Sequence, residues 1–218
     1  MRNTLYEDNA GDGIHWNKAS NPRLSYLASL QEVLYQEDGS IRIEIHSIPY
    51  YVMLDRLDRE SYSVFRSGGC TLLSYAIHQI TGLPIAVFDV EGEADWTGHT
   101  AVQIAPGVFA DIMGIFTEKE LIEEFYQSSL VRLLDARIVS NDDALYTVID
   151  KEFAESFPKA FITELEWLVV EDFAKRVILE CIIPYCDKNR LEITDELSNR
   201  LGQKDIKDRL GEALPSYR

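Results

Sequence analysis

The chain has few basic residues and no long uninterrupted run of apolar ones. Its 218 residues include 21 Lys+Arg against 37 Asp+Glu, which gives a formal net charge of −16 at pH 7. A protein that binds nucleic acid or an anionic membrane needs a basic face to neutralise phosphates, so this balance argues against both partners. The most apolar stretch, residues 161–185, is broken repeatedly by charged side chains, which excludes a membrane-spanning helix there.

Cysteine is also scarce. The three cysteines, Cys70, Cys181 and Cys186, are an odd number and lack the paired spacing of a zinc site or a disulfide framework. At least one is therefore a free thiol, and we expect neither a metal nor a cofactor. Cys181 and Cys186 lie in an apolar segment, where small buried side chains are expected. Because the first thirty residues carry charges and no apolar signal-peptide core, we expect a cytoplasmic protein.

No internal repeat, low-complexity tract or flexible linker divides the chain. Alternating and helical spacings of apolar residues both occur, so we predict an α+β fold. Residues 1–140 are predicted to form an α+β core, and residues 141–218 a helical extension packed on it. A further helix is predicted over residues 22–36 from leucines at helical spacing. The apolar fraction of 46% is that of a globular protein with a buried core.

The middle of the chain contains the elements that matter for function. Cys70 begins a predicted helix whose apolar residues recur at helical spacing until Gly82, a residue that favours helix termination. The neighbouring segments are predicted as a strand over 41–48, a buried strand over 84–90, a loop over 91–98, a hairpin of 99–105 and 108–114 around Pro106-Gly107, and a helix over 117–127 that starts with a capping box at Thr117 and Glu120.

Cys70 stands at a position where a thiol becomes nucleophilic. It follows Gly68 and Gly69 and lies in the first turn of the predicted helix, where backbone N–H groups and the helix dipole favour the thiolate. Without side chains at the two glycines, a substrate carbonyl can approach the sulfur closely and backbone N–H groups can face an oxyanion. We therefore predict Cys70 as a candidate nucleophile.

A cysteine nucleophile needs a base, and the base needs an orienting group. His99 begins one strand of the predicted hairpin, and Asp111 lies on the other strand across a tight turn. If both side chains project from the same face, the carboxylate accepts a hydrogen bond from one imidazole nitrogen and the other nitrogen faces Cys70. His78 is two turns along the Cys70 helix and cannot reach the sulfur.

Each of these residues, taken singly, has an ordinary structural explanation. A cysteine after glycines is more often a small helix-start residue, a histidine at a strand end is usually solvated or hydrogen-bonded, and an aspartate near a turn is common. The ordered set of Cys70, His99 and Asp111 on a helix start and two paired strands makes a catalytic triad the better interpretation.

This stretch resembles the core of papain-like and transglutaminase-like cysteine enzymes. The resemblance rests on Gly69-Cys70 before a helix that ends in Gly-Leu-Pro, on GHTAVQI, which contains His99, and on GVFADIMG, which contains Asp111. It is greatest to a bacterial and phage group with this order of segments. Membership would imply a Cys-His-Asp triad at these positions, on a helix packed against an antiparallel sheet. The tryptophan that often follows the histidine in transglutaminases is absent, and no upstream glutamine of a papain oxyanion hole is located.

The resemblance and the triad predict a cysteine-dependent amide- or acyl-transfer enzyme that acts through a thioester on a protein or peptide substrate. Hydrolysis of a peptide, an isopeptide or a glutamine amide and transfer to an amine are all compatible with these residues. Two rival functions stay open. One is a non-catalytic acidic effector or inhibitor that binds a basic protein, and the other is a glutamine deamidase or transglutaminase.

The candidate site lies in an acidic part of the chain. Between Arg66 and Arg132 the only basic residue is Lys119, whereas nine residues are acidic. The acidic segment 91–96 comes just before the candidate histidine, with Trp96 as a candidate stacking or lid residue. One interpretation is that this charge attracts a basic or amine-bearing substrate. The other is that the acidic side chains only keep the surface hydrated.

Overall fold

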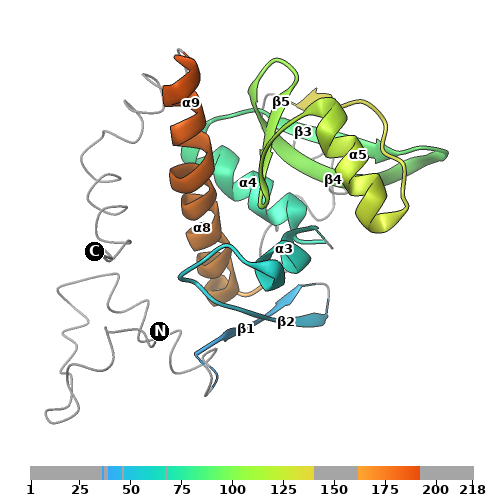
Figure 1. The fold of residues 1–218 in the computed structure, drawn as a ribbon. Helices are drawn as coiled ribbons and strands as arrows, with labels where there is room; N and C mark the ends of the chain where they lie inside the picture. Colours follow the sequence, from blue (N-terminus) through green and yellow to red (C-terminus); the bar gives the residue numbers. More distant parts are fainter. Residues whose placement is uncertain (1–35, 37–38, 46, 67, 140–161, 192–218) are drawn as a thin grey trace, which may run out of the picture.

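The structure is a computed structural model in which helices are mixed with antiparallel sheet, so the fold class is α+β, as predicted (Figure 1). None of the helices in the described part of the chain is long and apolar enough to cross a membrane. The predicted helix over 22–36 and the predicted domain boundary at residue 140 lie outside the described residues. The structure describes residues 36, 39–45, 47–66, 68–139 and 162–191.

A five-stranded antiparallel sheet positions the candidate site. Strands β3, β4 and β5 each pair with the next strand in the chain, and β7 returns to pair with the other edge of β3, which gives the order β6-β5-β4-β3-β7. Almost every side chain of β3 is buried because packed elements cover both faces of the sheet. The strands are β3 (Ile85–Val90), β4 (Glu93–Ala105), β5 (Val108–Asp111), β6 (Gly114–Thr117) and β7 (Arg137–Val139).

Helix α4 (Cys70–Thr81) packs on one face of the sheet and also against α8 (Glu164–Val177). Its beginning at Cys70 and its end at Gly82, which has the left-handed φ of 72°, are both as predicted. Apolar side chains of α4, α8 and the sheet share one buried cluster, to which Leu73 and Phe173 belong. The described part of the C-terminal helices is therefore packed on the same core as the candidate nucleophile.

The chain stays helical beyond the end of α8, and the three consecutive helical segments form one column. A π-helical turn, η1 (Ile178–Ile182), follows directly, and α9 (Ile183–Asn189) completes the column that runs from orange to red in Figure 1. Cys186 is buried within this column and Cys181 is half-buried, in agreement with the interpretation of both as packed side chains.

A two-stranded hairpin extends the same core on the side of α8. The predicted single strand over 41–48 is wrong after Ile45, because the chain turns at Ser47 (φ 63°) and returns to pair with itself. The alternation of apolar residues ends at Ile45, because Ser47 stands where the next apolar side chain would be. Helix α3, which had no clear sequence pattern, packs against β2 and α4. These elements are β1 (Ile41–Ile45), β2 (Ile48–Val52) and α3 (Arg59–Arg66).

The opposite face of the sheet is covered by α5 (Glu118–Ser129). The predicted capping box is present, because the Thr117 side chain accepts from the backbone N–H of Glu120 and the Glu120 carboxylate accepts from the Thr117 N–H. Phe125 of α5 packs with Phe88 and other apolar side chains of this sheet face in a second cluster. The sheet is thus enclosed between α5 on one side and α4 with α8 on the other (Figure 1).

Strand β4 is longer than the sequence suggests. The predicted loop over 91–98 is wrong from Glu93 onward, because Val90 pairs with Glu93 and the chain reverses through Glu91 and Gly92. The acidic composition of this segment favours a loop, yet pairing with β3 imposes a strand. The predicted strand 108–114 also differs, since β5 ends at Asp111 and the chain turns into β6.

Candidate active site

Cys70 is the first residue of α4, and the chain enters that helix through two glycines. Gly68 has a φ of 121°, a left-handed conformation that side-chain-bearing residues rarely adopt. Gly69 is the N-cap of the helix and offers no side-chain hydrogen bond to it. The N–H groups of the first turn are therefore not occupied by a capping side chain, and they lie beside the thiol.

The space that Gly69 leaves is filled by protein. A Cβ built on Gly69 would lie 2.9 Å from the Val64 carbonyl oxygen, 3.1 Å from Phe65 Cδ1 and 3.2 Å from Ile45 Cδ1. The prediction that this glycine opens an approach for a substrate carbonyl is therefore wrong. Its role is to let the end of α3 pack closely against the start of α4, which fixes the position of Cys70.

His99 and Asp111 meet on the face of the sheet that α5 covers. His99 Nε2 donates to Asp111 Oδ2 at 3.2 Å, and both residues are buried, at 0% and 5% exposure. Asp111 Oδ1 accepts from the Met113 N–H at 2.7 Å, so both oxygens of the carboxylate are held. The predicted hairpin geometry explains the meeting, since β4 and β5 pair from Val102 and Ala110 onward.

Cys70 lies near enough to His99 to interact with it. Burial by itself raises the pKa of the Cys70 thiol, but the hydrogen-bonding and charge interaction with His99 outweighs it, and Thr100 assists, so the pKa falls to about 7. Burial lowers the pKa of His99, but the bond to Asp111 and the interaction with Cys70 outweigh it and raise that pKa to about 9. Between these values the favoured state is a thiolate beside an imidazolium.

Buried polar atoms without partners gather around this pair. In the described part of the chain, the buried side-chain atoms that lack a regular hydrogen bond are His99 Nδ1, Thr100 Oγ1 and Arg66 Nε. Leaving such an atom unpaired costs about 1–3 kcal/mol, so native proteins rarely do it without a functional reason. Nδ1 is the His99 nitrogen that Asp111 does not use, and it is therefore available to Cys70.

Aromatic side chains and one arginine surround the imidazole. The His99 ring lies 5.3 Å from the Phe125 ring and 6.4 Å from that of Phe88, measured between centroids. The Arg66 guanidinium lies over the outer side of Phe125, 5.5 Å from its centroid, and forms an ion pair with Glu124. Arg66 lies on α3 and Phe125 on α5, so both helices contribute side chains to the surroundings of the imidazole.

Arg66 also contacts the segment that holds the aspartate. Its Nη1 donates to Met113 Sδ at 3.0 Å, and Met113 is the residue whose N–H binds Asp111. Sequence reasoning missed Arg66, Thr100 and Phe125. A basic residue at a helix end, a threonine in a strand and a phenylalanine on an amphipathic helix have ordinary structural explanations, so no pattern distinguished them.

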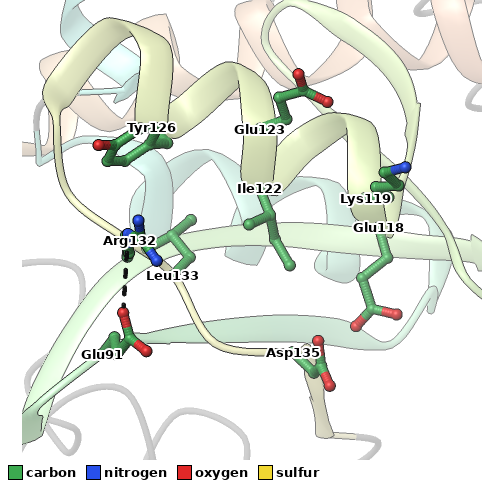
Figure 2. A pocket seen from close by; sticks show the side chains of 9 residues that line it. All are labelled: Glu91, Glu118, Lys119, Ile122, Glu123, Tyr126, Arg132, Leu133 and Asp135. Atoms are coloured by element: carbon green, nitrogen blue, oxygen red, sulfur yellow. Dashed lines mark ion pairs between the residues drawn. The ribbon is translucent and has the colours of Figure 1, made fainter.

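The acidic residues near the site form a separate hollow. A pocket of about 460 Å³ lies between α5, the β3–β4 turn and residues 132–135. Glu91 and Arg132 form an ion pair at 4.0 Å, which lies at one end of the pocket (Figure 2). Ile122 and Leu133 lie between the charged side chains (Figure 2). None of the three candidate triad residues lines this pocket. The side chains of residues 94–96, Trp96 included, lie outside what the structure describes.

The remaining candidate residues lie elsewhere. His78 is bound through Nδ1 to the Leu83 carbonyl oxygen at 2.7 Å, which agrees with its exclusion from the site. Burial raises the pKa of the Cys181 thiol, and Glu180 and Asp111 raise it further, so this cysteine is not activated. Within the described ranges, no group of three His, Cys, Asp or Glu side chains is placed to hold a metal ion.

Comparison with protein-family models, with curated proteins and with solved structures finds no match for this chain. The geometry and electrostatics of Cys70, His99 and Asp111 are therefore the basis for inferring a function.

Proposed function

We propose that the protein is a cysteine-dependent amide- and acyl-transfer enzyme that acts through a thioester on a protein or peptide substrate. Cys70 is the nucleophile, His99 the general base and acid, and Asp111 the group that orients the imidazole. The observation that carries the proposal is the buried hydrogen bond between His99 and Asp111 beside Cys70. The interaction of Cys70 with His99 supports it, because it lowers the pKa of the thiol to about 7 and raises that of the imidazole to about 9. A lowered pKa of the thiol beside a raised pKa of the imidazole is typical of a nucleophile paired with its base.

Between pH values of about 7 and about 9 the Cys70 proton already resides on His99 Nδ1, and in the first step the thiolate attacks the substrate carbonyl carbon. The carbonyl π-electron pair moves to oxygen, and the Cys70 N–H, at the start of α4 that no side chain caps, is the proposed donor to this oxyanion. His99 then protonates the leaving nitrogen as the C–N bond breaks, which leaves a thioester on Cys70. Water completes hydrolysis, whereas an amine completes acyl transfer.

The direction of approach supports the same assignment. Cys70 keeps 8% exposure, whereas His99 has none. Of the two residues, Cys70 is therefore the one that a substrate can contact from outside. Burial of the base also excludes bulk water from the thiolate–imidazolium pair, which strengthens the interaction between the two charges.

An activated ester tests the proposal without knowledge of the natural substrate. p-Nitrophenyl acetate should give a burst of one nitrophenolate per protein, and peptide mass spectrometry should place the acetyl group on Cys70. Cys70→Ala should abolish the burst. Cys181→Ser, which removes the half-buried thiol outside the site, should leave it unchanged. Acetylation of Cys181 in place of Cys70, or a burst that survives Cys70→Ala, would disprove the assignment.

We further propose that the acyl substrate is basic, because the chain around the site carries nine acidic residues against Lys119. Two methanethiosulfonate reagents of opposite charge test this. The trimethylammonium reagent should modify Cys70 faster than the sulfonate reagent, and added salt should reduce the difference. Equal rates that do not respond to salt would leave the acidic residues with a solubilising role only.

A further inference from the structure

We propose that the Thr100 hydroxyl donates a hydrogen bond to the Cys70 thiolate and stabilises it from the side opposite His99. The inference rests on the proposed function, since it assigns Thr100 to the same nucleophile. Thr100 directly follows His99 in β4 and is fully buried. Its Oγ1 has no hydrogen-bond partner among the described residues, so an unsatisfied hydroxyl group is buried in the core.

His99 and Thr100 are consecutive residues of β4, and the geometry of the strand explains how both reach the Cys70 sulfur. Neighbouring side chains of a strand point to opposite faces, so His99 faces α5 and Thr100 faces α4, which carries Cys70. Among the described residues, pairing of β4 with β5 starts at Val102 and Ala110, and the edge of β4 at His99 and Thr100 is therefore not covered by β5. Both His99 and Thr100 act on the Cys70 thiol, which places the thiol beside this edge.

Both the side chain and the backbone of Thr100 act on Cys70 in the direction that favours the thiolate. Other charged groups near the pair are Asp111 from β5 and the Arg66–Glu124 ion pair from α3 and α5, and these contact His99 and its surroundings. The Thr100 hydroxyl is therefore an uncharged hydrogen-bond donor for the Cys70 sulfur. When the proton leaves Cys70 for His99 Nδ1, the sulfur gains a full negative charge and the unpaired hydroxyl gains an acceptor.

This arrangement affects the second half of the reaction most. The thiolate is the leaving group when the thioester is hydrolysed, and a better-stabilised thiolate leaves faster. In the acyl-enzyme the sulfur carries no charge, so the hydroxyl is unpaired again. Thr100 thus stabilises the states in which the C–S bond is broken, and it should assist deacylation more than acylation.

Thr100→Val tests the inference, because valine keeps the branched shape and removes the hydroxyl. The rate of Cys70 alkylation by iodoacetamide is measured against pH, with peptide mass spectrometry to separate Cys70 from the other thiols. We expect the apparent pKa of the thiol to rise from about 7 toward about 8, and the plateau rate at high pH to rise about threefold because a more basic thiolate is more nucleophilic. Thr100→Ser should retain the wild-type profile.

A purely structural hydroxyl would behave differently. Below about pH 7 the Cys70 thiol is protonated and the Thr100 hydroxyl is unpaired, so Thr100→Val measured there should keep or raise the melting temperature while it raises the thiol pKa. An unchanged thiol pKa in folded Thr100→Val would overturn the inference and leave the proposed function intact. A wild-type thiol that titrates near 8.5 would instead overturn the proposed function. Should the valine variant not fold, Thr100→Ala and Thr100→Ser provide the same comparison.

Discussion

His99 binds Asp111 through Nε2 at 3.2 Å, while its other nitrogen, Nδ1, is buried without a regular partner on the side of Cys70. The two ring nitrogens thus have different environments, one anchored and one available. Asp111 is itself fixed by the Met113 N–H at 2.7 Å, so the orientation of the imidazole is set by the backbone of the β5–β6 turn. This asymmetry is what a base needs in order to exchange a proton with a single neighbour.

Asp111→Asn should remove the charge that anchors His99. The pKa of His99 should fall from about 9 toward its ordinary range, and hydrolysis of the acetyl-Cys70 thioester should slow by about 10²-fold because the base loses its orientation. NMR titration of the imidazole and the nitrophenolate steady state measure the two effects. Asp89→Asn is the control. Asp89 lies on β3, which pairs with the His99 strand β4, and among the described residues its carboxylate pairs only with Arg137, at 3.2 Å. Equal effects of the two substitutions would contradict the account.

The Cys70–His99 pair should leave the free energy of unfolding nearly independent of pH between about 7 and 9. The raised pKa of His99 gives stability that is complete below its unfolded value of 6.5 and is lost as pH rises through about 9. The lowered pKa of Cys70 gives stability that is complete above its unfolded value of 9.0 and is lost as pH falls through about 7. The two slopes are opposite and cancel, since folding only moves one proton from sulfur to nitrogen.

Denaturant unfolding at several pH values checks this cancellation. The difference between the wild type and the double variant Cys70→Ala, His99→Gln should stay constant from pH 7 to 9, because the double variant removes both groups. A difference that changes by about 1.4 kcal/mol per pH unit would mean that only one of the two groups is shifted.

Gly69→Ala should destabilise the protein through a steric clash. The new Cβ would lie 2.9 Å from the Val64 carbonyl oxygen, a backbone atom that cannot move without shifting the end of α3. We expect a loss of about 1–3 kcal/mol in the free energy of unfolding. Gly107→Ala separates this effect from backbone strain, because Gly107 has a φ of 70° and open space around it. A smaller loss at Gly69 than at Gly107 would show that the close approach of α3 and α4 is not tight.

A comparison of two capping boxes tests how much one hydrogen bond between the β1–β2 hairpin and α8 contributes to stability. Glu166 closes the box of Thr163 and also accepts the Glu44 N–H of β1 at 2.7 Å, whereas Glu120 closes the box of Thr117 only. Glu166→Ala leaves the Glu44 N–H without its partner, which should add about 1–3 kcal/mol of destabilisation. Chemical unfolding should therefore show a larger loss for Glu166→Ala than for Glu120→Ala. Equal losses would mean that the hairpin contributes nothing through this contact.

The sequence predicts those parts of the fold that local chemistry determines. The start of α4 at Cys70, its end at Gly82 and the capping box at Thr117 follow from residue types that act within one turn. The meeting of His99 with Asp111 is also predictable, because a short hairpin fixes which residues lie close together.

The rest depends on contacts between distant segments. Strand β4 begins in the acidic segment at Glu93 because β3 supplies hydrogen bonds to it, and β7 exists only because β3 has a free edge. The roles of Arg66 and Thr100 are visible only once α3, α4 and β4 are packed together. The chemistry of these two side chains depends on their burial. The burial of a single residue depends on the packing of the whole fold, so the local sequence does not reveal it.

The central claim is that Cys70 is an activated thiol, and the pH dependence of its alkylation tests this most directly. Iodoacetamide rates at Cys70 in the wild type should follow an apparent pKa of about 7, and His99→Gln should raise that value, because the imidazolium that stabilises the thiolate is lost. A Cys70 thiol that titrates at or above about 8.5 in the folded wild-type protein, and that does not respond to His99→Gln, would contradict the account.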